Sequence, residues 1–207
     1  MPRQTLLFDG HIAGFGTSTG TRLVVGRWRE SPFGPFTDVM VEQPDGHRIL
    51  LAPSEAVADF VSSTYTFDEV VVVPVASAIT HWGRRRAMLN VTAGPLVAAV
   101  TVGRVSALGA LLRLVPRELA TNTAWLRLIN PIARVLVPGA RTAGSAGQGR
   151  TEFYGVRSAR AITSIAATWD GDDLGHLTRL YPAVRFGFGS APAAPHLVSI
   201  VTTIHEP

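Results

Sequence analysis

The sequence predicts an α+β fold that is mainly antiparallel β, formed as a single domain over residues 1–207. Three observations predict it. Runs of β-branched or alternating residues recur toward both ends of the chain. Between those runs are spread 20 glycines and 14 prolines, as turns between many short strands require. A sustained helical period appears only in the middle of the chain, over 106–137.

The segment 31–53 carries the clearest local structure. Two prolines and a glycine restrict the backbone of Ser31-Pro32-Phe33-Gly34-Pro35 and predict a rigid connecting loop. Residues 37–42 then alternate polar and apolar, Pro44-Asp45-Gly46 has the chemistry of a turn, and 48–52 return. This segment therefore predicts a β-hairpin.

The next elements follow from capping and hydrophobic pattern. Ser54 is a good N-cap, and the apolar spacing after it predicts a helix over 55 to about 63. Four consecutive valines at 70–73 predict a strand buried on both faces. Residues 87–92 and 96–102 predict a second hairpin.

The second half of the chain begins with the helical period. Two prolines interrupt it, so 106–137 predicts a broken helical hairpin packed on the sheet. The glycine-rich stretch 139–149 predicts a mobile loop over a pocket. The remaining strands are expected around 150–169, 184–188 and 197–204.

The charged composition excludes several chemistries. All 19 basic residues are arginine, so no lysine can form a Schiff base or bind phosphate as in a P-loop. With no cysteine there is no disulfide and no thiolate nucleophile. A chain rich in arginine and without lysine suggests a GC-rich genome, for example an actinobacterial one. The net charge of +4 then follows from the codon usage of that genome rather than from binding to a nucleic acid.

The sequence gives no indication of export or of membrane insertion. The first sixteen residues lack the apolar run of a signal peptide. The apolar stretch 93–116 has Arg104 at its middle and is broken by glycine and proline, which a membrane span disfavours. We therefore expect a cytoplasmic protein without a membrane span.

Polar residues that alternate along two predicted strands are the best candidates for a site. Arg150, Glu152 and Tyr154 share one face of an extended chain, and so do Asp38, Met40 and Glu42. We take Glu152, Tyr154 and Asp38 as candidate catalytic residues. Candidate ligand-binding residues are Arg150, Glu42, Arg141 and Arg29. The alternative, an ordinary solvated sheet face, stays open. Six histidines are scattered without the spacing of a metal site, and we expect neither metal nor cofactor.

One segment carries a family resemblance. Ser31-Pro32-Phe33-Gly34-Pro35-Phe36, leading into the strand 38–42, resembles the "PFGPY-(N/E)-E" segment of the acetoacetate decarboxylase-like superfamily. The resemblance implies a mostly antiparallel β-cone or barrel around a small-molecule pocket, with a few helices packed outside. The decarboxylases of that family form a Schiff base on a lysine, which this chain lacks. The resemblance therefore implies a pocket without that chemistry.

Three functions remain open from the sequence. The first is a small-molecule-binding protein of decarboxylase-like fold, whose ligand is a small organic compound, an acidic one included. The second is an enzyme of the same fold that uses non-covalent acid–base chemistry, as hydratases, isomerases and lyases do, on a small organic acid. The third is an arginine-rich interaction or nucleic-acid-associated protein, although we expect no nucleic-acid partner. Homo-oligomerisation is also left open.

Overall fold

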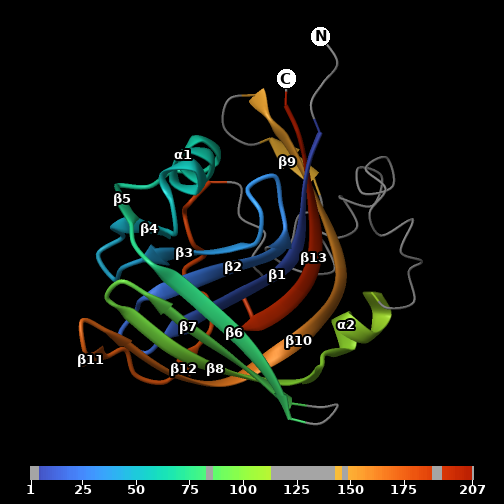
Figure 1. Cartoon of the computed structure of the whole chain (residues 1–207). Helices are drawn as coiled ribbons and strands as arrows, with labels where there is room; N and C mark the ends of the chain where they lie inside the picture. Colours follow the sequence, from blue (N-terminus) through green and yellow to red (C-terminus); the bar gives the residue numbers. More distant parts are fainter. Residues whose placement is uncertain (1–4, 83–85, 113–142, 146–148, 188–192, 207) are drawn as a thin grey trace.

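The computed structural model describes residues 5–82, 86–112, 143–145, 149–187 and 193–206 (Figure 1). Within these ranges the chain is mainly β. The strands are β1 (Thr5–Thr17), β2 (Arg22–Glu30), β3 (Phe36–Glu42), β4 (Arg48–Ala52), β5 (Glu69–Val72), β6 (Val75–Trp82), β7 (Arg86–Ala93), β8 (Leu96–Val105), β9 (Ala143–Ser145), β10 (Thr151–Trp169), β11 (Asp172–Asp173), β12 (Leu177–Thr178) and β13 (His196–His205). The helices are α1 (Glu55–Thr64) and α2 (Ala107–Leu112).

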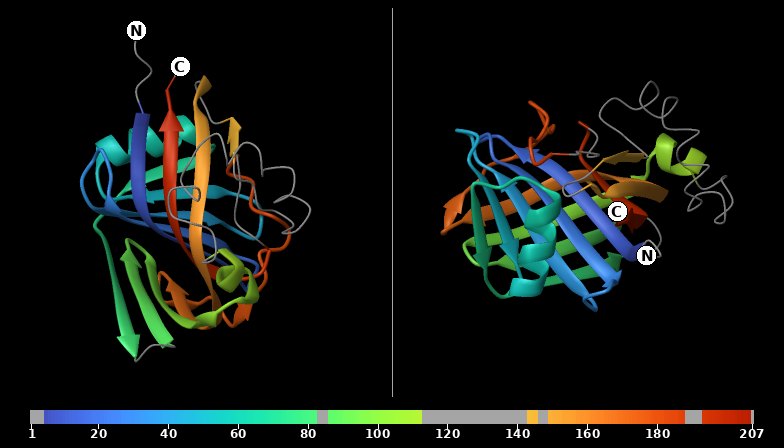
Figure 2. Two further views of the ribbon diagram at one scale, coloured as in Figure 1. Left: turned by 90° about the vertical axis from the view of Figure 1, so that its right-hand side faces the viewer. Right: turned by 90° about the horizontal axis from the view of Figure 1, so that it is seen from above.

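All these strands belong to one continuous, curled half-barrel sheet. Its order is β5-β4-β3-β2-β1-β13-β10-β8-β7-β6, with β9 and β11 paired to β10 and β12 paired to β1. Neighbours are antiparallel except β4 and β5, which are parallel and joined through α1. The left view of Figure 2 shows β1, β13 and β10 side by side, and they connect the β2–β5 half of the sheet to the β6–β8 half.

The main core lies where the two halves of the curled sheet face each other. Alternate residues of β2 and β3, such as Leu23, Val25 and Val39, belong to the same buried cluster as Leu89 of β7 and Val100 of β8. Period-2 alternation places the intervening residues of β2 and β3 on the opposite face of the sheet. That opposite face is the one that α1 covers.

Helix α1 begins where the sequence predicts. Ser54 is the N-cap, and its hydroxyl accepts a hydrogen bond from the Val57 N–H (3.4 Å). Val57, Ala58 and Val61 pack on Leu50 and Ala52 of β4, so the helix is fixed to one half of the sheet. Viewed from above, α1 lies over the blue and cyan strands of that half (Figure 2).

Helix α2 packs outside the sheet against β10. The Ser106 hydroxyl accepts a hydrogen bond from the Gly109 N–H (3.1 Å). Gly109 is so close to β10 that a Cβ there would overlap the backbone of Ala159. Helix α2 corresponds to the first residues of the predicted helical hairpin 106–137. Residues 113–137 of that prediction lie outside the described part of the chain.

The structure confirms both predicted hairpins, as β3–β4 and β7–β8, and the predominance of antiparallel β structure. The prediction for the four valines is wrong. Strand β5 is an edge strand whose Val71, with Val73 just after it, packs against the main core on one face, while Val70 and Val72 on the other face are 44% and 40% exposed. Hydrophobicity alone did not distinguish an edge strand from a central one.

The apolar stretch 93–116 is also explained in part. Its residues 96–105 form β8 and residues 107–112 form α2. Among the described residues, no helix has the length and apolar character needed to cross a membrane.

Candidate ligand pocket

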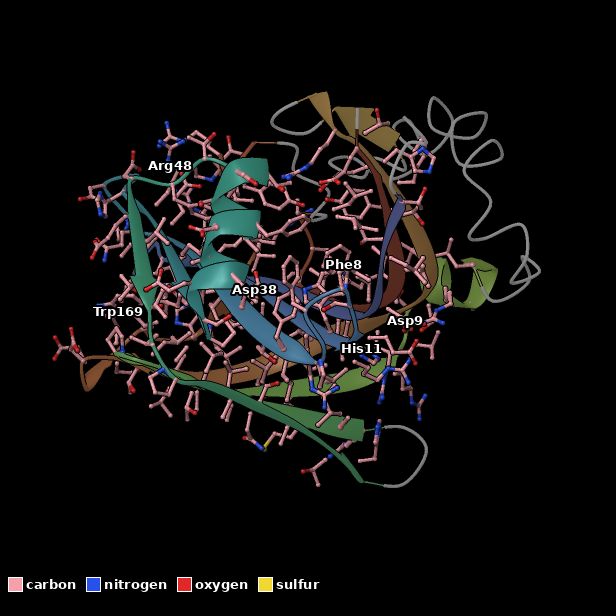
Figure 3. All side chains as sticks on the ribbon, turned by 45° about the horizontal axis from the view of Figure 1, so that its top comes forward. Phe8, Asp9, His11, Asp38, Arg48 and Trp169 are labelled. Carbon is pink, nitrogen blue, oxygen red and sulfur yellow. The ribbon has the colours of Figure 1, made fainter. Side chains whose placement is uncertain are left out.

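A pocket lies between α1 and the sheet face opposite the main core. Its volume is about 90 Å³, several times what one water requires, so it admits a small organic molecule. Strands β1, β2 and β3 form the floor, the C-terminal half of α1 and Tyr65 form the roof, and β10, β13 and the segment 184–186 close the sides. Figure 3 shows Asp38 of the floor and Phe8 of β1 beside α1.

Most of the lining is apolar and much of it is aromatic. The aromatic lining residues are Phe8, Trp28, Phe36, Phe60, Tyr65, Tyr154 and Phe186. Several of these rings pack on one another: the Phe8 ring stacks on that of Phe60 (centroids 5.3 Å apart) and meets the Trp28 ring edge-on (5.5 Å). Such packing holds large side chains in place without polar contacts, so the wall is preformed.

The connecting loop 31–35 is held above this aromatic wall. The Ser31 hydroxyl accepts a hydrogen bond from the Phe33 N–H (3.0 Å) and the Ser31 carbonyl accepts one from Gly34 (3.1 Å). Gly34 has φ +77°, a conformation that favours glycine. The loop places the Phe33 ring against Phe60 (5.1 Å), so the predicted rigid loop supports one end of the pocket.

Glu152, Tyr154 and Tyr65 form a buried hydrogen-bonded cluster on the pocket wall. Tyr154 Oη donates to Glu152 Oε2 (2.7 Å), and Tyr65 Oη lies 3.1 Å from the same oxygen. The two phenol oxygens are themselves 2.7 Å apart. The Glu152 side chain is fully buried. Tyr154 and Glu152 alternate on β10 as predicted, whereas Tyr65 follows the last residue of α1.

The two phenol protons can be shared as a chain. Tyr65 Oη donates to Tyr154 Oη and Tyr154 Oη donates to Glu152 Oε2, so both 2.7 Å contacts carry a proton. Burial raises the pKa of Glu152, against the lowering effect of the two phenols and of Arg150. The Glu152 carboxyl group is therefore already engaged by donors of the protein.

The two phenols are held in their neutral form. Burial, followed by the nearby Glu152 charge, raises the pKa of both Tyr65 and Tyr154 well above the ordinary value. Both therefore remain hydrogen-bond donors at any physiological pH, and neither can serve as a phenolate base without a large cost.

Asp38 is the second buried carboxyl group of the pocket. It is 2% exposed, and its Oδ1 accepts a hydrogen bond from Trp28 Nε1 (3.2 Å). Burial raises its pKa to about 7, against the lowering effect of that indole N–H. Gly26 makes room for the pair, because a Cβ there would lie 2.5 Å from Asp38 Oδ1 and 2.9 Å from Trp28 Nε1.

Arg150 supports the pocket from outside its lining. Its guanidinium donates to the hydroxyls of Ser63 (2.6 Å) and Thr64 (3.1 Å) at the end of α1. It also lies over the Phe60 ring (4.9 Å) and pairs with Glu206 (3.4 Å). Arg150 thus connects the end of α1 to the start of β10 and lowers the pKa of Glu152, while it donates to groups of the protein itself.

The other predicted ligand-binding residues are not brought to the pocket. Glu42 is fully buried and pairs with Arg22 (3.1 Å) and Arg185 (3.0 Å), outside the pocket lining. Arg29 is 52% exposed and pairs with Asp9 (2.7 Å). It has the opposite orientation to its neighbour Trp28, which lines the pocket. Arg141 lies outside the described residues.

Asp9 belongs to a separate charged group on β1. Two arginines, Arg29 and Arg157, each donate to Asp9 Oδ1 at 2.7 Å, and they lower its pKa against the effect of burial. Burial lowers the pKa of the neighbouring His11 to about 4, with the nearby arginines adding to the effect. Figure 3 shows Asp9 and His11 apart from Asp38.

Several pocket residues were not anticipated from the sequence, and three of them, Tyr65, Thr202 and Trp28, bear on its chemistry. Tyr65 follows α1 and Thr202 lies on β13 opposite Tyr154, so only the tertiary fold brings them to β10. The Thr202 hydroxyl is buried without a hydrogen-bond partner among the described residues. Trp28 could have been found, because it lies two residues from Gly26 on the same strand face, and Gly26 is opposite Asp38 in the next strand.

Metal ligation has no support in the described residues, where no group of three or more His, Asp or Glu side chains converges as metal ligands would. Comparisons with protein-family models, with curated proteins and with solved structures find no match to this chain.

Proposed function

We propose that this protein binds a small organic ligand in the pocket between α1 and the sheet. The observation that supports this most directly is a preformed, mainly apolar cavity with two buried carboxyl groups, Asp38 and Glu152, in its wall. Burying such groups costs free energy that an ordinary core avoids. A few polar groups placed in an apolar pocket are the usual composition of a ligand site.

The proposal includes a relationship to the acetoacetate decarboxylase-like fold. Its support is the sequence of the connecting loop 31–36 together with the curled, mostly antiparallel sheet and its pocket. Schiff-base decarboxylation is not part of the proposal, because the chain has no lysine. The buried groups that remain are carboxyls and phenols, which bind and polarise a ligand without a covalent bond.

The test is to identify what the pocket holds and to block it. Native mass spectrometry of the purified protein should detect a bound small molecule that is lost on denaturation. Val24→Trp places a large side chain on the pocket floor and should abolish that binding. Val97→Trp is the matched control, since Val97 is 53% exposed on β8 and does not line the pocket. Equal ligand retention by both folded variants would refute binding at this site.

A second candidate function, a non-covalent acid–base enzyme, has one specific observation in its favour. Asp38 has a pKa raised to about 7, the value at which a carboxyl group exchanges protons most effectively near neutral pH. Glu152 and the two phenols could then hold a substrate carbonyl. Once a ligand is known, Asp38→Asn separates the two functions: an enzyme loses turnover at saturating substrate, while a binding protein only loses affinity.

A further inference from the structure

The charge of the pocket lining restricts what can bind. Of the described residues that line the pocket, none is arginine or histidine, and the chain has no lysine. The titratable groups facing Asp38 across the cavity are Tyr65 at the end of α1 and Glu152 and Tyr154 on β10. The lining residues of β1, β2, β13 and 184–186 do not titrate. An anionic ligand would therefore meet carboxyl groups and no counter-charge.

The two carboxyl groups are not equivalent. Glu152 accepts a hydrogen bond from Tyr154, lies 3.1 Å from the Tyr65 phenol and has Arg150 nearby, so groups of the protein already compensate its charge. Asp38 has an indole N–H as its side-chain donor and no arginine beside it to compensate its charge. Asp38 is therefore the carboxyl group whose negative charge a ligand would meet without a counter-charge from the protein.

Aromatic side chains surround the space next to Asp38. Phe8, Trp28 and Phe36 come from the floor, Tyr65 from the roof, and Phe186 from the side. The Phe60 ring also belongs to the roof, but it is stacked on Phe8 and lies under the Arg150 guanidinium, so it closes the site rather than binding a cation. The faces of such rings attract cations, most strongly in a desolvated site. The unpartnered Thr202 hydroxyl adds an acceptor on the same wall.

From this arrangement we propose that the ligand is a small organic ammonium ion, bound by the Asp38 carboxylate and enclosed by the aromatic rings. The inference rests on the proposed function and names its ligand class. An ammonium group supplies the positive charge and N–H donors that the lining lacks, and its alkyl or aryl part fills the apolar remainder of a cavity of about 90 Å³. The ligand would thus be an amine, and the organic acid expected from the sequence would be disfavoured.

The test compares ligands of equal shape and different charge. Binding of butylammonium, 1-butanol and butyrate, and of benzylammonium, benzyl alcohol and benzoate, is measured by isothermal titration calorimetry at pH 6 and pH 8. We expect each ammonium ion to bind at least ten-fold more tightly than its alcohol, and the carboxylates not to bind. Because a pKa of about 7 leaves Asp38 mostly protonated at pH 6 and mostly ionised at pH 8, ammonium affinity should rise about ten-fold between them.

The variants assign the effect to one residue. Asp38→Asn keeps the shape of the side chain and should remove both the preference for ammonium and the pH dependence. Asp172→Asn removes an equal charge from the exposed strand β11 and should bind as the wild type does. Far-ultraviolet circular dichroism establishes that each variant is folded.

Two outcomes would overturn the inference in different ways. If the alcohols bind more tightly than the ammonium ions, or if ammonium binding weakens from pH 6 to pH 8, protonated Asp38 donates to a neutral ligand. The pocket would then still bind a ligand, but the ligand would not be an ammonium ion. No heat of binding from any of the six compounds at millimolar concentration also overturns the ammonium inference, while retention of a native ligand blocked by Val24→Trp would still support the pocket.

Discussion

Replacing Asp38 with asparagine is expected to stabilise the protein in a pH-dependent way. Burial raises the pKa of Asp38 in the folded protein from its ordinary value of 3.8 to about 7. The unfolded chain therefore ionises this group at a lower pH than the folded protein does. Between these two pKa values the unfolded state loses its proton first, so the wild type becomes less stable as pH rises from 3.8 to 7. Asparagine carries no such titration.

The magnitude follows from the two pKa values. Each pH unit between them costs about 1.36 kcal/mol of stability. Between pH 5 and pH 8 the folded protein therefore loses about 2–3 kcal/mol of stability through the ionisation of Asp38. The free energy of unfolding of Asp38→Asn minus that of wild type should increase by this amount from pH 5 to pH 8.

Urea unfolding at pH 5, 6, 7 and 8 measures this difference by linear extrapolation. Asp9, His11 and Glu152 also titrate with shifted pKa values, but they are present in both proteins and their contributions cancel in the subtraction. Asp172→Asn, with an exposed side chain, is the control and should show no pH-dependent difference. A change below about 0.5 kcal/mol, or one of opposite sign, would show that Asp38 is ionised and compensated inside the folded protein.

Three further substitutions test the packing and hydrogen bonds of the pocket. Gly26→Ala should destabilise the protein by about 1–3 kcal/mol, because the new Cβ displaces the Asp38 carboxyl from the Trp28 N–H; an unchanged urea midpoint would show that the strand relaxes freely. Tyr154→Phe removes the phenol that donates to buried Glu152 at 2.7 Å and should lower the free energy of unfolding by about 1–3 kcal/mol. In a double-mutant cycle with Tyr65→Phe the two losses of stability should not be additive, and additive losses would contradict a shared cluster. Ser54→Ala removes the α1 N-cap and should cost about 1 kcal/mol, measured by thermal unfolding, whereas an equal melting temperature would mean that water replaces the cap.

The local structure around the pocket could be predicted from the sequence because local chemistry determines it. Alternation in 37–42 correctly placed Asp38 and Met40 on one face, and the structure shows that this face lines the pocket. The turn at 44–46 and the Ser54 N-cap depend only on residues close in the chain. Alternation on β10 likewise placed Glu152 with Tyr154.

What the sequence could not supply was the relation between distant strands. Tyr65 reaches Glu152 only because α1 lies across a sheet in which β10 has curled toward it, and nothing near Tyr65 indicates that partner. Arg29 was predicted as a ligand-binding residue because of its charge. As the next residue after Trp28 in β2 it points to the other face of the sheet, and only the tertiary fold shows that the Trp28 face lines the pocket. The valines of β5 were misjudged for the same reason: hydrophobicity does not say whether a strand is central or at an edge.

The strand order has a consequence for how the pocket comes into existence. β1 and β13 come from opposite ends of the sequence, yet they are neighbours in the middle of the sheet, with Thr5 opposite His205. The hairpins β2–β4 and β6–β8 can form from local contacts, but only β13 joins the two halves through β1 and β10. Since Phe8, Tyr154 and Thr202 come from these three joining strands, the pocket is incomplete until β13 is paired with both of its neighbours. Ligand binding would therefore stabilise only the completed sheet, and it would accelerate none of the earlier steps of folding.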